Sequence, residues 1–280
     1  MADYTLEEQL IARMAREFKP KDEFAVNGVT YCCRIAHAVA KRLYAPGLGL
    51  WVNAQGKSAF ASKVTFYLTR PSVAEEDVEI YFSVLDIIFW RNIGYLSMWM
   101  SAAQVDQYGN ANITLIGDKK TPRAALGGSV GMADNPVLTD HAYIVMRNHS
   151  ARTFVEKVDF ISGAGWVPER ERGQMRSKVM NPVFSNLGVF DFDPQTHHMR
   201  LQSVHKGVKV EDVVANTGFP LVVPSQVPET AAPTEEELAA IRDIDPFGLR
   251  RLDHAVGPEA AAITAEIRAK EEAFFAAQAR

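Results

Sequence analysis

Apolar residues recur at helical spacing near the amino terminus and predict two helices there. Residues 5–18 carry apolar side chains on one face, and Thr5 and Glu8 have the spacing of a capping box at the start of this segment. Further along, residues 29–43 keep the same periodicity until Pro46 stops it. The chain therefore opens with two amphipathic helices.

The carboxyl-terminal part of the chain alternates helical and extended patterns. Residues 207–214 form a short helix candidate, and residues 220–233 contain four prolines without a clear period, which predicts an extended surface connector. A second capping box, at residues 234–237, opens a helix that ends before Asp245. Residues 258–280 are rich in alanine and alternate acidic with basic side chains, so we expect a helix that packs on the domain or extends toward a partner chain.

Short apolar runs separated by turns occupy the middle of the chain and predict strands. These runs cover residues 48–52, 63–68, 95–100, 113–116, 141–146 and 154–160. Few polar residues interrupt them, as expected of strands that helices cover on both faces. Later, residues 188–192 and 199–204 flank a turn at 193–196 and predict a hairpin. Strands between helices favour α/β layering.

Composition and charge exclude several classes of protein. With 280 residues, of which 47% are hydrophobic, the chain can bury a substantial core. The 30 basic and 34 acidic residues give a net charge of -4, so the chain as a whole lacks the basic surface that binds nucleic acid or an anionic membrane. A polyanionic ligand therefore needs a local basic site.

Cysteine usage and the amino terminus indicate the compartment. The two cysteines, Cys32 and Cys33, are adjacent and cannot act as the spaced disulfides of a secreted scaffold. The acidic residues Asp3, Glu7 and Glu8 do not fit a secretory leader, and no apolar run approaches the roughly 20 residues of a membrane span. We expect a soluble, cytoplasmic protein that binds neither nucleic acid nor a membrane.

The most specific local pattern is A-Q-V-D-Q-Y-G-N-A-N-I-T, at residues 103–114. Gln104 is a candidate for hydrogen bonding to a ligand. A Gly-Asn pair also suits a turn, in which Asx side chains cap their own backbone. We therefore interpret Asp106, Asn110 and Asn112 as structural.

A second pattern is the glycine loop, which we define as residues 127–131. Glycines adopt positive φ and let backbone N–H groups converge on an anion or a developing oxyanion, such as a thioester carbonyl under attack. Taken alone, such a G-G-x-x-G run is more often a plain turn. The candidate binding residues in it are Gly127, Gly128, Ser129 and Gly131.

These two patterns, with residues 152–161 and 188–192 after them, resemble the family I coenzyme A transferases in one collinear order. Small subunits of that family carry an A-Q-V-D-x-x-G-N-x-N-x-T run and a G-S-G-G-x-x-D loop. The resemblance covers residues 25–245. One departure is Val130, which stands where the family usually has glycine.

The resemblance implies the fold and the domain organisation. We expect an α/β fold with an open, mostly parallel sheet and helices on both faces. Residues 1–245 then form the transferase-like domain and residues 246–280 a carboxyl-terminal helical extension. Because the chain lacks the second half of the fused family members, it resembles the small subunit of a heteromer, with a large transferase-like subunit in an α2β2 complex.

The position of the family's nucleophile is the main departure. Active transferases of this family use a glutamate in an S-E-N-G or similar loop, which becomes a covalent thioester with coenzyme A. The best match here is Asn53-Ala54-Gln55-Gly56, which puts Ala54, or Asn53 after a one-residue slip, at that position. The nearest glutamates are Glu23 and Glu75. Neither an amide nor a methyl group can form the acyl anhydride through which transfer proceeds.

Three interpretations follow. The first is a branch of the family in which small and large subunits open the last carbocycle of a steroid-derived acyl-CoA; water and a general base cleave a carbon–carbon bond in a retro-Claisen sense, and the large subunit supplies the acid or base. The second is a coenzyme A transferase for a dicarboxylic or short-chain acid, with its nucleophile on the other subunit. The third is a non-catalytic scaffold subunit.

We take the ring-opening hydrolase as the leading hypothesis. It implies that Asn53 and Gln55 orient water or polarise a ring carbonyl without being acylated. Coenzyme A enters as part of the substrate, and no separate cofactor is expected. The lone histidines have no ligand spacing, so no metal is expected either. The residues expected to bind the substrate or coenzyme A are Gly56, Gln104, Gly127, Gly128, Ser129 and Gly131.

Overall fold

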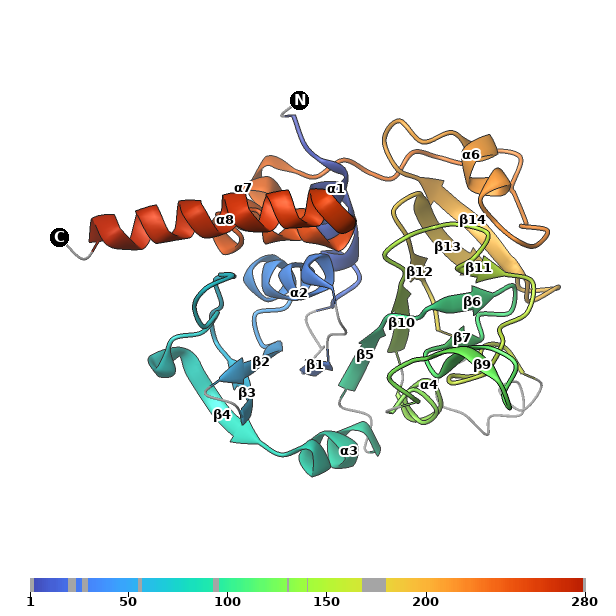
Figure 1. Cartoon of the computed structure of the whole chain (residues 1–280), viewed down its shortest axis with the longest axis horizontal. Coiled ribbons are helices and arrows are strands. Elements are labelled where there is room, and N and C mark those ends of the chain that lie inside the picture. Colours follow the sequence, from blue (N-terminus) through green and yellow to red (C-terminus); the bar gives the residue numbers. More distant parts are fainter. Residues whose placement is uncertain are drawn as a thin grey trace. The chain divides into compact units, whose positions relative to one another are not determined.

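The structure is a computed structural model that describes residues 3–19, 24–26, 30–54, 57–92, 96–129, 131–139, 141–167 and 180–278. Contacts divide the chain into two compact units. The first unit comprises residues 1–88 and 231–280, and the second unit comprises residues 89–230. Both units combine helices with strands (Figure 1), which confirms the predicted α/β class. The predicted division into residues 1–245 and 246–280 stays a prediction.

The sheet of the first unit has the order β1-β2-β3-β4. Its strands are β1 (Phe24–Val26), β2 (Gly49–Ala54), β3 (Lys57–Ala61) and β4 (Val78–Phe82). β1 and β2 are parallel, whereas β2, β3 and β4 pair antiparallel. The predicted strand over residues 63–68 is wrong, because Phe66 N–H donates to the carbonyl of Ile244 and not to a neighbouring strand.

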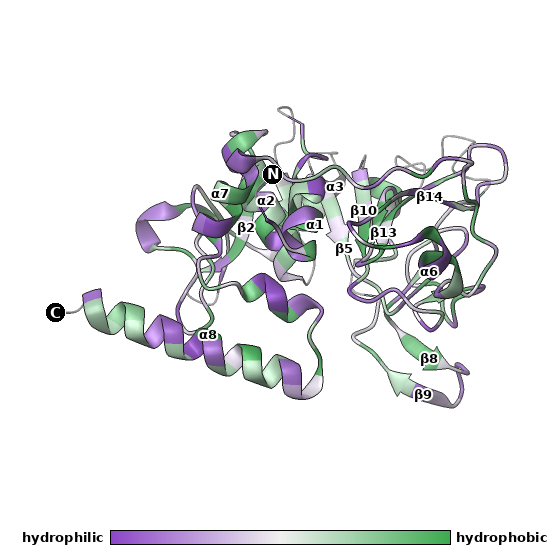
Figure 2. Ribbon diagram, turned by 90° about the horizontal axis from the view of Figure 1, so that it is seen from above, coloured by the Kyte–Doolittle hydropathy of each residue, from purple (hydrophilic) through white to green (hydrophobic). Residues whose placement is uncertain are grey.

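Two helices of the first unit, α1 (Leu6–Ala15) and α7 (Glu235–Ile244), begin where the predicted capping boxes lie. α2 (Tyr31–Leu43) and α8 (Gly257–Gln278) are also α-helices, and the 3-10 helices are η1 (Glu75–Asp77) and η2 (Leu249–Asp253). Thr5 with Glu8 and Thr234 with Glu237 form complete capping boxes. Figure 2 shows polar and apolar residues mixed along the length of α8, whose buried residues are Ile267 and Glu271.

The second unit contains a sheet with the order β14-β13-β12-β10-β5. Its strands are β5 (Leu96–Met100), β10 (His141–Val145), β12 (Val183–Phe184), β13 (Gly188–Phe192) and β14 (Met199–Val204). β5, β10 and β12 run parallel, and the predicted hairpin β13–β14 is confirmed as an antiparallel edge. Buried Trp99 stacks on Tyr143 at 4.1 Å in its core.

Smaller elements of the second unit carry the sequence motifs. A three-stranded sheet joins β11 (Phe154–Val155), β6 (Gln104–Asp106) and β7 (Ala111–Asn112), and β8 (Leu115–Gly117) forms a hairpin with β9 (Pro122–Ala125). Among the described residues of this unit, α4 (Asn135–Leu138) and α6 (Val210–Ala215) are helices, and α3 (Val84–Asn92) includes residues of both units. The strand predicted over residues 154–160 ends at Val155, because the following backbone turns so that Asp159 N–H donates to Gln104 Oε1.

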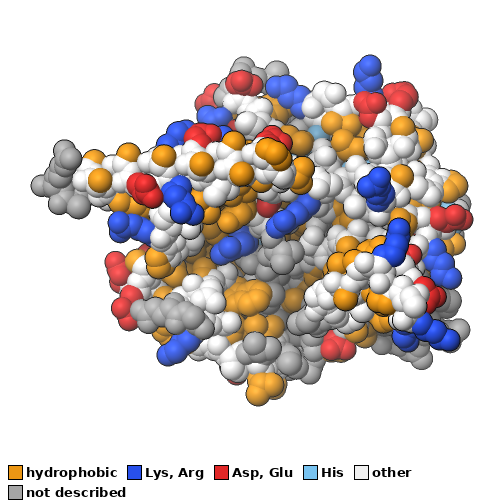
Figure 3. Space-filling model, viewed as in Figure 1, with side chains coloured by type: hydrophobic (Ala, Val, Ile, Leu, Met, Phe, Trp, Pro, Cys, Tyr) orange, Lys and Arg blue, Asp and Glu red, His pale blue; other side chains and the backbone are white. Residues whose placement is uncertain are grey.

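Charged side chains of both signs lie among one another on the face drawn in Figure 3, as the near balance of 30 basic and 34 acidic residues predicts. None of the helices in the described part of the chain combines the length and the apolar character that a membrane crossing requires.

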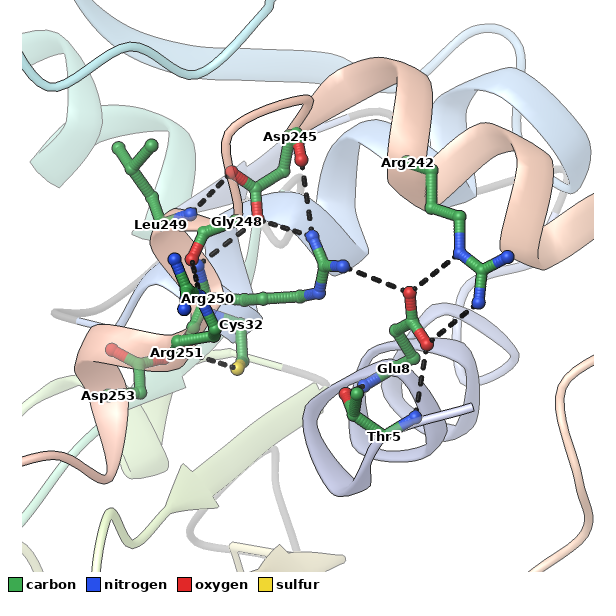
Figure 4. A network of polar contacts seen from close by, with 10 residues as sticks. All are labelled: Thr5, Glu8, Cys32, Arg242, Asp245, Gly248, Leu249, Arg250, Arg251 and Asp253. Atoms are coloured by element: carbon green, nitrogen blue, oxygen red, sulfur yellow. Dashed lines mark hydrogen bonds and ion pairs between the residues drawn. The ribbon is translucent and has the colours of Figure 1, made fainter. Parts of the chain in front are cut away.

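An ionic network around the buried Glu8 joins α1 to α7 and η2 in the first unit (Figure 4). Glu8 is 1% exposed, and its carboxylate accepts hydrogen bonds at 2.9 Å from both Arg242 Nε and Arg250 Nη2. Arg250 also donates to Asp245 Oδ2 at 2.9 Å. Both arginines are more than 230 positions away from Glu8 along the chain. The network therefore fixes the amino-terminal helix against the carboxyl-terminal segment.

A second long-range contact caps α2. The carboxylate of Asp253 accepts hydrogen bonds from the N–H groups of Tyr31 at 2.9 Å and Cys32 at 2.6 Å. Thr30 Oγ1 accepts a third, from Cys33 N–H at 3.1 Å. An anionic group at a helix amino terminus satisfies donors that have no partner within the helix. Asp253 thus continues the link between the two ends of the chain.

We expect Glu8→Gln to destabilise the protein by about 2–3 kcal/mol at neutral pH, because it removes the charge of one of the two buried carboxylates that Arg250 binds. Burial raises the pKa of Glu8, but the hydrogen bonds from Arg242 and Thr5 and the charge of Arg250 outweigh it, so the folded pKa lies below 4.5. The carboxylate therefore stabilises the fold above about pH 4.5, and this contribution is lost as pH falls through the folded pKa.

Urea unfolding of the wild type and the variant at a series of pH values tests this expectation. The difference between the two proteins should be largest at neutral pH and should shrink in acid. Glu266→Gln, on the exposed surface of α8, is the matched control and should leave the unfolding midpoint near that of the wild type. A difference that does not change with pH would contradict the assignment.

Candidate functional site

Asp106 holds the turn at the centre of the A-Q-V-D motif. It is 3% exposed, and its Oδ1 accepts hydrogen bonds at 3.0 Å from the N–H groups of Tyr108 and Asn110. Asn110 Nδ2 donates to Asp106 Oδ2 at 2.9 Å, and Asn110 Oδ1 accepts from Gly165 N–H at 2.8 Å. Burial raises the pKa of Asp106 despite these donors. The side chains of Asp106 and Asn110 form hydrogen bonds within the protein, in agreement with the prediction that they are structural.

Asn112 connects this motif to Gln104. Asn112 is fully buried, and its Nδ2 donates to Gln104 Oε1 at 2.8 Å and to the carbonyl of Leu115 at 2.7 Å. Its Oδ1 accepts from Thr114 N–H at 3.0 Å. Gln104 is 6% exposed, and its Nε2 donates to Asp159 Oδ2 at 3.1 Å. Gln104 therefore connects Asn112 to Asp159 within the protein.

Three hydroxyl groups attach the glycine loop to this frame. Thr114 Oγ1 lies 3.0 Å from Ser129 Oγ and 2.7 Å from Ser162 Oγ. Ser162 Oγ also accepts from the N–H of Ile113 at 2.9 Å, and Gly128 N–H donates to the carbonyl of Ile113 at 3.1 Å. The motif at residues 103–114 thus positions the glycine loop. Sequence reasoning missed Ser162, since no local pattern marks it as a partner of Thr114.

The backbone of the glycine loop has the conformation that the sequence predicts. Gly128 has φ +83° and Gly131 has φ +74°. A Cβ at Gly127 or Gly128 would meet nothing within 4 Å, so the space beside the loop is open. In the described part of the chain, Gly127 and Ser129 do not donate their backbone N–H groups within the protein. These two N–H groups can serve an oxyanion, whereas that of Gly128 is already used.

Asn53 and Ala54 lie in the first unit and belong to a strand. β2 extends to Ala54, and Asn53 pairs with Ser58 of β3. Asn53 is exposed and Ala54 is 4% exposed, since successive side chains of a strand point to opposite faces. A side chain that must reach a ligand fits position 53 better than position 54. Gln55 and Gly56 lie outside the described residues.

The structure therefore brings five of the predicted residues together at one hydrogen-bonded frame of the second unit. Gln104, Gly128 and Ser129 are hydrogen-bonded within this frame, and Gly127 and Gly131 lie in the same glycine loop. Asn53 belongs to the first unit, and Val130 lies outside the described residues. Among the residues that the structure describes, no cluster of His, Cys, Asp or Glu is arranged to hold a metal ion. The substrate-binding and catalytic roles of all these residues stay predictions.

Comparison with known proteins places the chain in a family. The Coenzyme A transferase family profile matches residues 83–216. One glutaconate CoA-transferase subunit, from Acidaminococcus fermentans, is 30% identical over 275 residues, which cover 88% of this chain and 96% of that protein. The chain belongs to the coenzyme A transferase family. The resemblance inferred from the four ordered motifs is confirmed.

Other members of the family are also similar to this chain. The cholesterol ring-cleaving hydrolase IpdB subunit of Rhodococcus jostii is 36% identical over 153 residues, or 54% of this chain. That match spans 60% of the length of the IpdB subunit. The crystal structure of Rhodococcus jostii RHA1 IpdAB aligns with a TM-score of 0.79 at 25% identity, covering 91% of this chain and 100% of that chain. The coenzyme A transferase fold is therefore established over most of the chain.

Gly128→Ala should destabilise the protein by about 1–2 kcal/mol, because the left-handed backbone conformation strains a residue with a Cβ. No steric clash adds to this cost, since the space beside Gly128 is open. Gly127→Ala is the matched control in equally open space and should stay within about 0.5 kcal/mol of the wild type. Urea unfolding measures both variants. Equal losses would show that loop strain is not what requires glycine at 128.

Ala54→Glu should destabilise the protein by about 3 kcal/mol, because it places a carboxylate at a buried position. Asn53→Glu places the same group on the exposed face and should cost less than about 1 kcal/mol. Thermal and urea unfolding measure this difference. The reverse order of stabilities would assign the outward position to residue 54.

Proposed function

We propose that this chain is the small subunit of a heteromeric, cytoplasmic hydrolase that opens the last carbocyclic ring of a steroid-derived acyl-CoA. In this proposal it assembles with a large transferase-like subunit, two copies of each. The similarity to the IpdB subunit supports the proposal, and so does the glycine loop with two backbone N–H groups that do not donate within the described protein.

The observation that carries the proposal is the missing acid in the Asn53-Ala54-Gln55-Gly56 segment. No Asp or Glu occurs between Glu23 and Glu75. A transferase nucleophile on this segment would have to be a carboxylate, since only a carboxylate can form the acyl anhydride. Asn53 cannot serve in that way.

The neighbouring strands do not supply a substitute. Among the described strands of the first unit, the only carboxylate is that of Glu79 on β4. Phe82 of β4 is the residue level with Ser58, the partner of Asn53. Glu79 is three positions from Phe82, or about 10 Å along the strand. Its carboxylate lies 3.9 Å from Lys41 Nζ, so it already has a cationic partner.

The proposed reaction uses water where a transferase uses glutamate. A hydroxide equivalent adds to the ring carbonyl carbon β to the thioester, and the bond from that carbon to the α carbon breaks. The electron pair passes to the thioester enolate, which takes up a proton, and the product carries a new carboxylate with coenzyme A still attached. Backbone N–H groups of the glycine loop stabilise the developing oxyanion, and Asn53 and Gln55 orient the water or the ring carbonyl. The large subunit supplies the acid and base.

Coenzyme A transfer is the second candidate. The glutaconate CoA-transferase match extends over 88% of this chain, against 54% for the IpdB subunit. In a transferase the nucleophilic carboxylate would come from the large subunit. The two candidates make different products and different enzyme intermediates.

We expect the chain, reconstituted with its large subunit, to convert a ring-bearing β-keto acyl-CoA to an opened acid that retains coenzyme A. Mass spectrometry of the products identifies it. Hydroxylamine added during turnover should trap no glutamyl-CoA adduct. Transfer of coenzyme A to a free acid, with such an adduct, would establish the transferase instead. Ser129→Ala should lower turnover, since Ser129 holds the glycine loop through Thr114, and unchanged turnover in an intact complex would favour a scaffold.

A further inference from the structure

The second unit contains a cavity of about 650 Å³ beside the frame of the glycine loop. The sheet β11-β6-β7 and the hairpin β8–β9 contribute residues to its lining. Alanine, isoleucine and valine side chains line part of it. Its polar lining consists of Gln104, Arg123, Arg152 and Asp159. Nothing in the reaction proposed above uses the two arginines.

The side chains of these two arginines have no polar partner among the described residues. Arg123 and Arg152 are exposed and form no hydrogen bond or ion pair with the described residues of the chain. Other arginines behave differently. Arg200 of the same unit binds Asp191 with two hydrogen bonds of 2.7 and 2.8 Å, and Arg250 of the first unit binds two carboxylates. The guanidinium groups at the cavity are therefore available to a ligand.

Asp159, the one carboxylate that lines the cavity, accepts hydrogen bonds from groups other than the two arginines. Asp159 Oδ2 accepts hydrogen bonds from Gln104 Nε2 at 3.1 Å and from Gly117 N–H at 2.9 Å. It forms no ion pair with either arginine of the cavity. The side chain of Arg123 lies next to Gly117, since a Cβ there would lie 3.4 Å from Arg123 Cγ and 3.5 Å from its Nε, at contact distance. The two arginines and one carboxylate leave a net positive charge in a chain whose overall charge is -4.

We propose that Arg123 and Arg152 bind an oxyanion of the acyl-CoA substrate in this cavity. The substrate class comes from the function proposed above, and the site itself comes from the geometry. A guanidinium group presents paired donors that match the oxygens of a phosphate or a carboxylate. Acyl-CoA carries phosphates at its nucleotide end and can carry a carboxylate on its acyl group. A space of about 650 Å³ admits a group larger than a lone carboxylate, which favours the phosphates.

A chain of hydrogen bonds connects the cavity to the glycine loop. Gln104 lines the cavity and accepts a hydrogen bond from Asn112. Asn112 in turn accepts from Thr114 N–H, and the Thr114 hydroxyl bonds to Ser129. An anion held by the two arginines is thereby fixed relative to the loop on which the thioester carbonyl is expected. Binding energy from a remote part of the substrate can then orient its reacting part.

Isothermal titration calorimetry of the full chain tests the proposal. The ligands are coenzyme A, pantetheine, which lacks the phosphates, and glutarate. Arg123→Gln and Arg152→Gln should each weaken binding of the recognised anion by about tenfold or more, as loss of a charged hydrogen bond does. Pantetheine should bind equally to all proteins. Lys120→Gln, which removes one exposed charge from the same hairpin without lining the cavity, is the matched control and should bind like the wild type.

The three ligands separate the sources of the oxyanion. Weaker binding of coenzyme A by the arginine variants assigns the site to phosphate, and weaker binding of glutarate assigns it to an acyl carboxylate. Three results would overturn the proposal. They are unchanged affinity of the arginine variants for both ligands, no binding of either anion by the wild-type chain, and an equal loss of affinity in Lys120→Gln. Intact ring opening by an arginine variant with unchanged affinity would reject this site and leave the proposed reaction standing.

Discussion

The second unit depends on a small set of buried polar side chains that must all be hydrogen-bonded. Asp106, Asn110 and Asn112 are each at most 9% exposed, and an unpartnered polar group at such a site costs about 1–3 kcal/mol. Each of these side chains instead binds backbone or amide groups of neighbouring segments. This requirement fixes the course of the chain through residues 103–114, and through Thr114 it fixes the glycine loop. The conformation beside the expected thioester is therefore a consequence of internal hydrogen bonding.

The segment that would carry a transferase nucleophile is held by backbone pairing between strands. β2 and β3 form an antiparallel pair, and Asn53 is exposed on it. This backbone pairing does not depend on which side chain stands at position 53. An amide donates and accepts hydrogen bonds but cannot form an anhydride. In the function proposed above, the family fold surrounds a position at which an amide stands in place of the acylable carboxylate. In the function proposed above, attack by water takes the place of acylation at this site.

The sequence predicted the parts of the structure that local patterns control. Capping boxes at Thr5 and Thr234 located two helices correctly, because the cap uses residues three positions apart. The strand predicted over residues 63–68 was wrong, because that segment bonds to distant Ile244. The motif at residues 103–114 was recognised, but the arginines of the cavity were not, since no spacing joins Arg123 to Arg152 before the chain folds. Pairing across long separations was the part that the sequence did not reveal.

The central claim is that this chain keeps the frame for a thioester while water replaces the acylable acid. The most direct test is turnover of the reconstituted enzyme in water enriched in oxygen-18, with mass spectrometry of the coenzyme A product. Hydrolytic ring opening predicts one labelled oxygen in the new carboxylate and an unchanged thioester. A product without the label, together with a glutamate of either subunit joined to coenzyme A as a thioester, would contradict the account.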